Sequence, residues 1–282
     1  MPRSRRDERE AARGLALYFA ILLPLSALGY WLWVARRQHT ALIFVPAVAS
    51  AAARLARREG FADVSFRLGR GFGRAAAAAL GVPLAACSVA YGGAWAAGLV
   101  DFAPARLPAP FPSLGDPRLH FAWTALLSLT VVTAFFVPLA AGEEVGWRGY
   151  LLPRMVEAGV PRPLLASGLV WALWHVPLIV AGAYGPGAGA PAAAALVFVP
   201  VATAYGVFVG HLRLTTGSVW PAVLAHAAWN ALTQACFNPA VKPRLWPWLG
   251  ESGLLVAAVL PAVVAAALRL RAPRPAAGGA GP

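Results

Sequence analysis

Three short polar groups interrupt the apolar second half of the sequence, and their residue types are those of a hydrolytic site. The first lies in GEEVGWRGYLL at 142–152, the second in WALWHVP at 171–177 and the third in HAAWN at 226–230. A carboxylate beside a neutral imidazole can hold and deprotonate water, and a second imidazole with an amide can donate to a developing oxyanion. The side chains are, in chain order, Glu143, Glu144, Arg148, Trp171, His175, His226 and Asn230.

Each group also has a purely structural interpretation. If the helix continues beyond residue 146, Glu144 and Arg148 lie one turn apart and can form an ion pair that only closes the helix end. His175 precedes Pro177, whose ring frees a backbone carbonyl that an imidazole N–H could satisfy. The third group could bridge two helices by hydrogen bonding. Because one shared cavity is more economical than three separate structural explanations, we favour a common polar site.

A metal ion is an open alternative within the same set of residues. Two histidines and one glutamate match the ligand set of a catalytic zinc, with water in the fourth position. The candidate ligands are Glu143, His175 and His226. The sequence has no H-E-x-x-H, so the common zinc-protease helix is absent.

The elements that carry these residues are predicted to be membrane-spanning helices. The chain of 282 residues is 59% hydrophobic and 12% charged, against about 25% charged in soluble proteins. A spanning helix needs about 20 mostly apolar residues, so an all-α, polytopic membrane protein with about eight such helices is expected. The predicted spans are 14–34, 41–56 (a short one), 75–99, 121–146, 163–183, 192–212, 218–238 and 252–270.

The distribution of positive charge predicts the orientation. With the N-terminus inside, 18 of the 24 Lys and Arg residues fall on one side and six on the other. Both termini are therefore expected in the cytoplasm, with the protein in the inner (plasma) membrane. The net charge of +13 does not indicate a nucleic-acid partner, because the arginines lie between apolar runs and form no face. The basic segment 54–74 is expected to be a solvated cytoplasmic loop or an amphipathic element on anionic lipid.

The depths of the polar residues agree only in part. Counted from the cytoplasmic ends at 1.5 Å per residue, His226 lies about 12 Å deep and His175 about 18 Å deep. Glu143 falls close to the cytoplasmic edge if its span ends at 146, so its helix must be tilted or start late to reach the histidines.

The three groups together resemble the CAAX-protease and bacteriocin-processing (ABI) family of intramembrane proteases. EEVGWR is similar to the family's EExxxR, WALWH to its F-x-x-x-H and HAAWN to its H-x-x-x-N, with the resemblance covering roughly residues 120 to 235. It implies a helical membrane protease with a conical cavity open to the cytoplasm and the bilayer. Four domains follow: a cytoplasmic tail 1–13, spans and a basic linker 14–119, the protease core 120–238, and a last span with a cytoplasmic tail 239–282.

The resemblance also implies a role for each residue. Glu143 with His175 would activate water, and His226 with Asn230 would stabilise the oxyanion. Glu144 and Arg148 would support the first motif. Trp171 stands where the family usually has Phe, which we interpret as a conservative exchange of aromatic residues. The family is commonly labelled a metalloprotease, so bound zinc is an open possibility.

The expected function is an intramembrane endopeptidase that cleaves near the C-terminus or leader of a peptide or membrane-anchored protein. One alternative is a non-catalytic scaffold or bacteriocin-immunity protein with the same fold; another is a transporter with a proton relay. The Ala- and Arg-rich composition, with a single Lys, indicates a bacterial source, where prenylated substrates are not expected.

Overall fold

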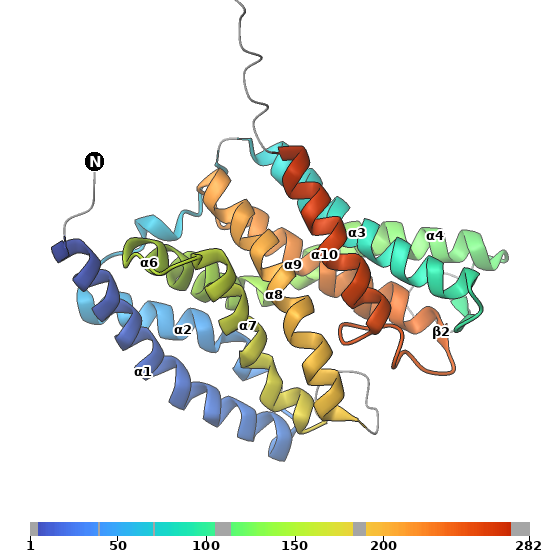
Figure 1. The fold of residues 1–282 in the computed structure, drawn as a ribbon, viewed down its shortest axis with the longest axis horizontal. Helices are drawn as coiled ribbons and strands as arrows, with labels where there is room; N and C mark the ends of the chain where they lie inside the picture. Colours follow the sequence, from blue (N-terminus) through green and yellow to red (C-terminus); the bar gives the residue numbers. More distant parts are fainter. Residues whose placement is uncertain (1–4, 39, 70, 105–113, 183–189, 272–282) are drawn as a thin grey trace, which may run out of the picture.

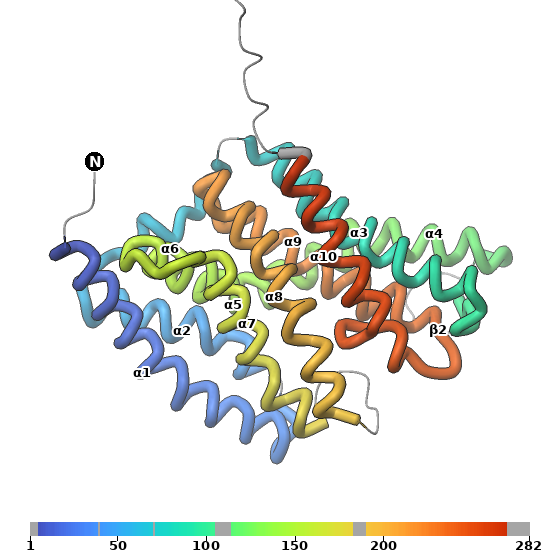
Figure 2. The backbone as a smooth tube through the Cα atoms, in the orientation of Figure 1, coloured from blue at the N-terminus to red at the C-terminus, as the bar shows by residue number. Residues whose placement is uncertain are grey.

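The computed structural model describes residues 5–38, 40–69, 71–104, 114–182 and 190–271. Within them the chain is helical apart from turns, loops and one antiparallel pair of two-residue strands, β1 (Asp101–Phe102) and β2 (Val241–Lys242). Parts of the predicted tails and of the linkers after the third and fifth spans lie outside the described residues. The arrangement is drawn as a ribbon in Figure 1 and as a tube in Figure 2.

Each predicted span coincides with helical structure. Among the described residues, six helices are long and apolar enough to cross a membrane, and Leu254–Arg269 is a shorter apolar helix. The expectation of an all-α, polytopic membrane protein is thereby confirmed. Apart from the fourth span, the helices are α1 (Arg5–Arg36), α2 (Thr40–Arg57), α3 (Phe72–Ala96), α7 (Pro163–Val180), α8 (Pro191–Thr216), α9 (Trp220–Leu232) with a π-helical turn at Thr233–Phe237, and α10 (Leu254–Arg271).

The fourth predicted span lies in one helical path of 41 residues, Pro117–Glu157, which continues past the predicted end of the span at 146. It comprises α4 (Pro117–Leu127), α5 (Thr133–Gly146) and α6 (Leu152–Glu157), joined by π-helical turns at Ser128–Val132 and Trp147–Leu151. Both acids are buried within this helix, where Glu144 pairs with Arg148 and Glu143 accepts hydrogen bonds from Trp147 and Trp171. Glu143 consequently lies 14 residues before the helix end, about 20 Å along its axis, which removes the predicted mismatch in depth.

The helices have two chemically different ends. We call one of them the basic end. It contains the start of α1, the linker between α2 and α3, the end of α6 and the turn between α8 and α9. At the other, the hairpin end, lie the α1–α2 turn, the paired strands and the start of α10. In Figure 1, α1 and α2 run side by side, and α7 and α8 form the neighbouring pair.

Glycines allow the helices that carry the site to approach closely. A Cβ at Gly206 on α8 would lie 2.7 Å from the Cα of Gly168 on α7. A Cβ at Gly146 on α5 would lie 2.4 Å from the backbone carbonyl of Pro46 on α2. Since real Cβ atoms do not approach other atoms so closely, these contacts require glycine and fix the spacing of α7 to α8 and of α5 to α2.

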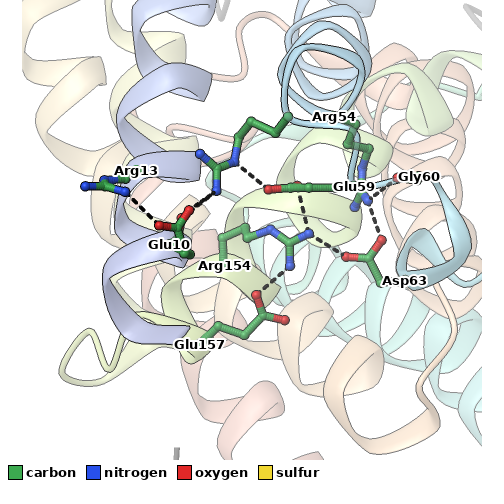
Figure 3. A network of polar contacts seen from close by, with 9 residues as sticks. Glu10, Arg13, Arg54, Glu59, Gly60, Asp63, Arg154 and Glu157 are labelled. Atoms are coloured by element: carbon green, nitrogen blue, oxygen red, sulfur yellow. Dashed lines mark hydrogen bonds and ion pairs between the residues drawn. The ribbon is translucent and has the colours of Figure 1, made fainter. Parts of the chain in front are cut away.

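The basic linker is held at the basic end by a network of ion pairs, which Figure 3 shows. Arg54 is fully buried; it donates to the carbonyl oxygens of Gly60 (2.9 Å) and Gly149 (2.8 Å) and pairs with Asp63. Arg154 on α6 donates to Glu59 at 2.9 Å. Among its described residues the linker contains one short 3₁₀ turn, Ala62–Val64. The ion pairs hold it against α2 and α6, but much of it is exposed, including Phe61, Phe66 and Arg67. The interpretation as a solvated loop or as an amphipathic element on lipid therefore stays a prediction.

The carboxylates of this linker are stabilised in their charged form. Burial alone would raise the pKa of Glu59, but hydrogen bonds from Arg57 and Arg154 outweigh it, so that this pKa is lowered. The pKa of Asp63 is also lowered: partial burial would raise it, but the hydrogen bond from Arg54 and the positive charges of Arg54 and Arg154 together outweigh burial. Both acids remain ionised at neutral pH and hold α2, α6 and the linker together.

Candidate active site

A cavity of about 490 Å³ brings the predicted residues together. Its walls come from α5, α7, α8, α9 and the turns that follow α9, and from the loop before α10, with single residues from α1, α2 and α10. Glu144 and Arg148 lie fully buried behind the wall, with 0% of either side chain exposed. The predicted residues that line the cavity are Glu143, Trp171, His175, His226 and Asn230.

The carboxylate of Glu143 is oriented by two indole groups. Its Oε2 accepts a hydrogen bond from Trp171 Nε1 at 2.9 Å and a longer one from Trp147 Nε1 at 3.4 Å. Only 7% of the residue is exposed. Within the described residues both donors use the same oxygen, which leaves Oε1 to a water molecule or a substrate.

Glu144 is the centre of a buried group of charges. Its Oε1 lies 2.9 Å from Arg148 Nη1 and 2.9 Å from His226 Nδ1. Arg148 also donates to the carbonyl of Gly206 at 3.3 Å, and its guanidinium lies 4.7 Å from the ring centroid of Trp171. The expected pairing of Glu144 with Arg148 is thus present, and the contact with His226 adds a second helix to it.

The two histidines are held in defined tautomers. His175 Nδ1 lies 2.9 Å from the carbonyl oxygen of Trp171, which only accepts, so Nδ1 carries the proton and Nε2 the lone pair. That carbonyl is not the one that Pro177 frees, which belongs to Leu173 four residues earlier. His226 Nδ1 faces a carboxylate and also carries a proton. Its Nε2 therefore accepts in the neutral form and donates only as an imidazolium, which Glu144 stabilises.

Trp171 connects the three helices of the site. Its ring centroid lies 5.5 Å from that of His175 and 5.3 Å from that of His226, while its N–H holds Glu143. A phenylalanine could make the ring contacts but not the hydrogen bond. The substitution of Trp for the family's Phe is therefore more than an exchange of aromatic bulk.

The predicted metal ligands do not form an assembled metal site. Among the described residues, no group of three or more His, Cys, Asp or Glu side chains is arranged to hold an ion. Since the residues in this arrangement do not fit a metal, no step below depends on one.

Three polar residues of the cavity were not predicted: Gln234, Asn238 and Glu251. Gln234 and Asn238 continue the spacing of four that begins with His226 and Asn230, so extending that series would have found them. Glu251 follows in the loop before α10, where its carboxylate accepts from Trp229 Nε1 at 2.9 Å. No pattern in the sequence pointed to this residue.

The fold and the cavity define a polytopic helical membrane protein with a buried acid–imidazole site. Residues 122–232, which include all three polar groups, match the family model described as Type II CAAX prenyl endopeptidase Rce1-like. The match confirms the predicted resemblance to the CAAX-protease family and supports a CAAX-type membrane endopeptidase in general. No curated protein matches the sequence.

Proposed function

We propose that the protein is an intramembrane endopeptidase that hydrolyses a peptide bond near the C-terminus or leader of a peptide or membrane-anchored substrate. The observation that carries this proposal is the convergence of Glu143, His175, His226 and Asn230 on one cavity, from three separate helices. The family match supports the reaction class but not these roles, which rest on the geometry.

Glu143 and His175 activate the water molecule. As acceptors of the water protons we assign Oε1 of Glu143 and Nε2 of His175, the ring nitrogen that does not face the Trp171 carbonyl. As the water oxygen bonds to the carbonyl carbon, its proton passes to one of these bases. When the C–N bond breaks, the same proton goes to the departing amine, and a carboxylic acid and an amine are released.

His226 and Asn230 stabilise the oxyanion. The carbonyl oxygen becomes negative when water attacks, and fixed donors at that position lower the barrier by more than they would in water. The amide of Asn230 supplies one N–H. The imidazolium of His226 supplies the other, because the Glu144 carboxylate accepts from its Nδ1 and stabilises the charged form. Glu144 and Arg148 thus position the site without touching the substrate.

The protein is proposed to lie in the plasma membrane of a bacterium with both termini in the cytoplasm. This orientation follows from the excess of arginine at the basic end.

The test is a comparison of peptide termini in membrane proteomes from cells that contain wild-type protein or Glu143→Gln at matched levels. Glutamine keeps the shape and the acceptor for Trp171 but is not a base. We expect termini that appear with wild type and are absent with Glu143→Gln. Glu8→Gln, a change of an exposed acid on α1, serves as the control and should behave as wild type. If all three proteomes agree while every protein is folded and inserted, the scaffold or immunity alternative replaces the protease.

A further inference from the structure

A row of polar side chains runs along α9 and the π-helical turn that follows it. His226, Asn230, Gln234 and Asn238 follow at intervals of four residues, and all of them line the cavity. The first two belong to the proposed site, whereas the last two have no role in it. Gln234 is exposed, and Asn230 and Asn238 are half-buried. We call Asn230, Gln234 and Asn238 the amide row.

The π-helical turn keeps the amide row in line. An α-helix turns through about 100° per residue, so residues four apart drift by about 40° and the row would rotate by about 80° between Asn230 and Asn238. The turn at Thr233–Phe237 is closed by bonds between residues five apart and winds less per residue, which counteracts this drift. Short π-helical turns of this kind occur frequently at functional sites. The local geometry thus presents the three amides on one side of the cavity.

Asn238 is held so that it acts as a donor. The backbone N–H of Gly250 donates to the hydroxyl oxygen of Tyr91 at 3.1 Å, and the hydroxyl proton is donated in turn to Oδ1 of Asn238. With its oxygen facing Tyr91, the amide of Asn238 offers the N–H bonds of Nδ2 to the cavity that it lines. The side-chain amide of Gln234 has no hydrogen-bond partner among the described residues, so it can both donate and accept.

The spacing of the amide row matches that of an extended peptide. Residues four apart on a helix are separated by about 6 Å along its axis. In an extended chain, residues two apart are separated by about 6.4–6.8 Å, and their backbone groups face the same edge. A side-chain amide can accept from a backbone N–H and donate to a backbone carbonyl, as a neighbouring strand does. The amide row can therefore bind successive backbone groups along one edge of an extended segment.

We propose that Gln234 and Asn238 bind the backbone of the substrate in extended conformation, at about two and four residues from the cleaved bond. The inference rests on the proposed function and names the form in which that site takes its substrate. Asn230 donates to the carbonyl of the cleaved bond, Gln234 pairs with a backbone amide two residues away, and Asn238 donates to a carbonyl beyond it. Because these contacts involve the backbone, the site selects an extended segment and not a particular side chain. A helical substrate must therefore unwind over these residues before it is cleaved.

The test uses the purified full-length protein in detergent micelles and internally quenched peptides whose sequence surrounds a terminus that wild type releases in cells. Each backbone amide on either side of the cleaved bond is replaced in turn by an ester, which removes the N–H and weakens the carbonyl as an acceptor. Mass spectrometry of the products confirms that the cleaved bond is unchanged. We expect two sensitive positions on one side of that bond, two residues apart. At each, the ester should raise KM about fivefold with kcat little changed, the effect of one hydrogen bond.

Two variants assign the two positions. Gln234→Met keeps the length and the unbranched shape of the side chain but has neither donor nor acceptor. It should bring the ratio of KM between ester and amide close to one at the nearer position and leave the farther position sensitive. Asn238→Asp keeps the acceptor for Tyr91 and removes the donor, so it should do the reverse. Gln38→Met is the matched control, because Gln38 is an exposed glutamine between α1 and α2, and it should keep both sensitive positions.

The wild-type scan stands without any variant, so a variant that fails to fold leaves the result decisive. Peptides that are cleaved with no sensitive position, or with sensitive positions that are not two residues apart, overturn this inference alone and leave the protease intact. Sensitivity that survives at both positions in folded Gln234→Met and Asn238→Asp shows that other groups bind the backbone, which also overturns it. If wild type releases no termini in cells, the proposed function fails and the inference fails with it.

Discussion

The hydrogen bond from Trp171 to Glu143 can be removed while almost everything else that Trp171 does is kept. In Trp171→Phe the ring still packs against His175 and His226 and beneath the guanidinium of Arg148, but the indole N–H is lost. Glu143 then retains only the longer bond from Trp147 at 3.4 Å. A hydrogen bond to a charged group is worth about 1.5–3 kcal/mol, which corresponds to a factor of about 10 to 100. We expect kcat to fall by this factor, with KM little changed, because the carboxylate is less well held during proton transfer.

Trp174→Phe is the matched control. Trp174 lies on the same helix, lines the same cavity and also donates its indole N–H over 2.9 Å, but to the hydroxyl of Ser26. Both variants lose one buried hydrogen bond and some ring volume, so their losses in thermal stability should be similar. Only Trp171→Phe should lose rate. The assay is kcat and KM on a cleaved peptide, with thermal unfolding of each protein in the same detergent. Equal losses of rate in both variants, or full activity in Trp171→Phe, would refute the role of this hydrogen bond.

Three further perturbations test the framework. Glu144→Gln leaves a buried guanidinium unpaired at a cost of about 3–5 kcal/mol, so by size-exclusion chromatography it should fail to accumulate as folded protein, whereas Glu143→Gln folds. Gly206→Ala places a methyl group against α7 and should lower thermal stability by about 1–3 kcal/mol, while Gly81→Ala, which faces open space, should not. The folded pKa of Glu59 lies below its unfolded value, so its stabilising effect is present at neutral pH and is lost as pH falls through the lowered value. Unfolding temperatures measured from pH 7 to pH 3 should therefore fall less steeply in Glu59→Gln than in wild type.

The membrane helices were predictable because length and apolar composition are local properties. Every predicted span coincides with helical structure, and the series from His226 to Asn230 already marked the face of α9 that lines the cavity. The polar groups were predictable as a set for a simpler reason. Charged and hydrogen-bonding side chains are costly in hydrocarbon, so those that occur there have partners or functions.

What the sequence did not predict depends on partners that are distant along the chain. The fourth helix continues through Glu144 and Arg148 because His226, 82 residues away from Glu144, and the carbonyl of Gly206 complete the polar group. From the sequence alone, Trp171 is an aromatic residue without an identifiable hydrogen-bond partner. Its partner, Glu143, lies 28 residues earlier in the chain and is brought next to the indole only by the fold. Glu251 belongs to the cavity only because its loop folds back onto α9.

The cavity extends from the middle of the helices toward the hairpin end, away from most of the positive charge. Trp33 and Leu178, near the ends of α1 and α7, line the cavity toward the hairpin end, and the cavity reaches the surface at the exposed Gln234. The resemblance to the CAAX-protease family implies a cavity open to the cytoplasm. The charge count instead predicts that the basic end lies in the cytoplasm and the mouth of the cavity on the other side. The two predictions disagree for this chain.

A single-cysteine experiment decides between the two orientations. Cys87 and Cys236 are buried, so an added surface cysteine is the reactive one among the described residues. Asp101→Cys lies on the exposed strand β1 at the hairpin end, and Glu8→Cys lies on an exposed turn of α1 at the basic end. If the charge count is right, a membrane-impermeant maleimide labels Asp101→Cys in intact cells and reaches Glu8→Cys only after permeabilisation. The reverse pattern would place the mouth in the cytoplasm, and the substrate would then have to approach from inside the cell.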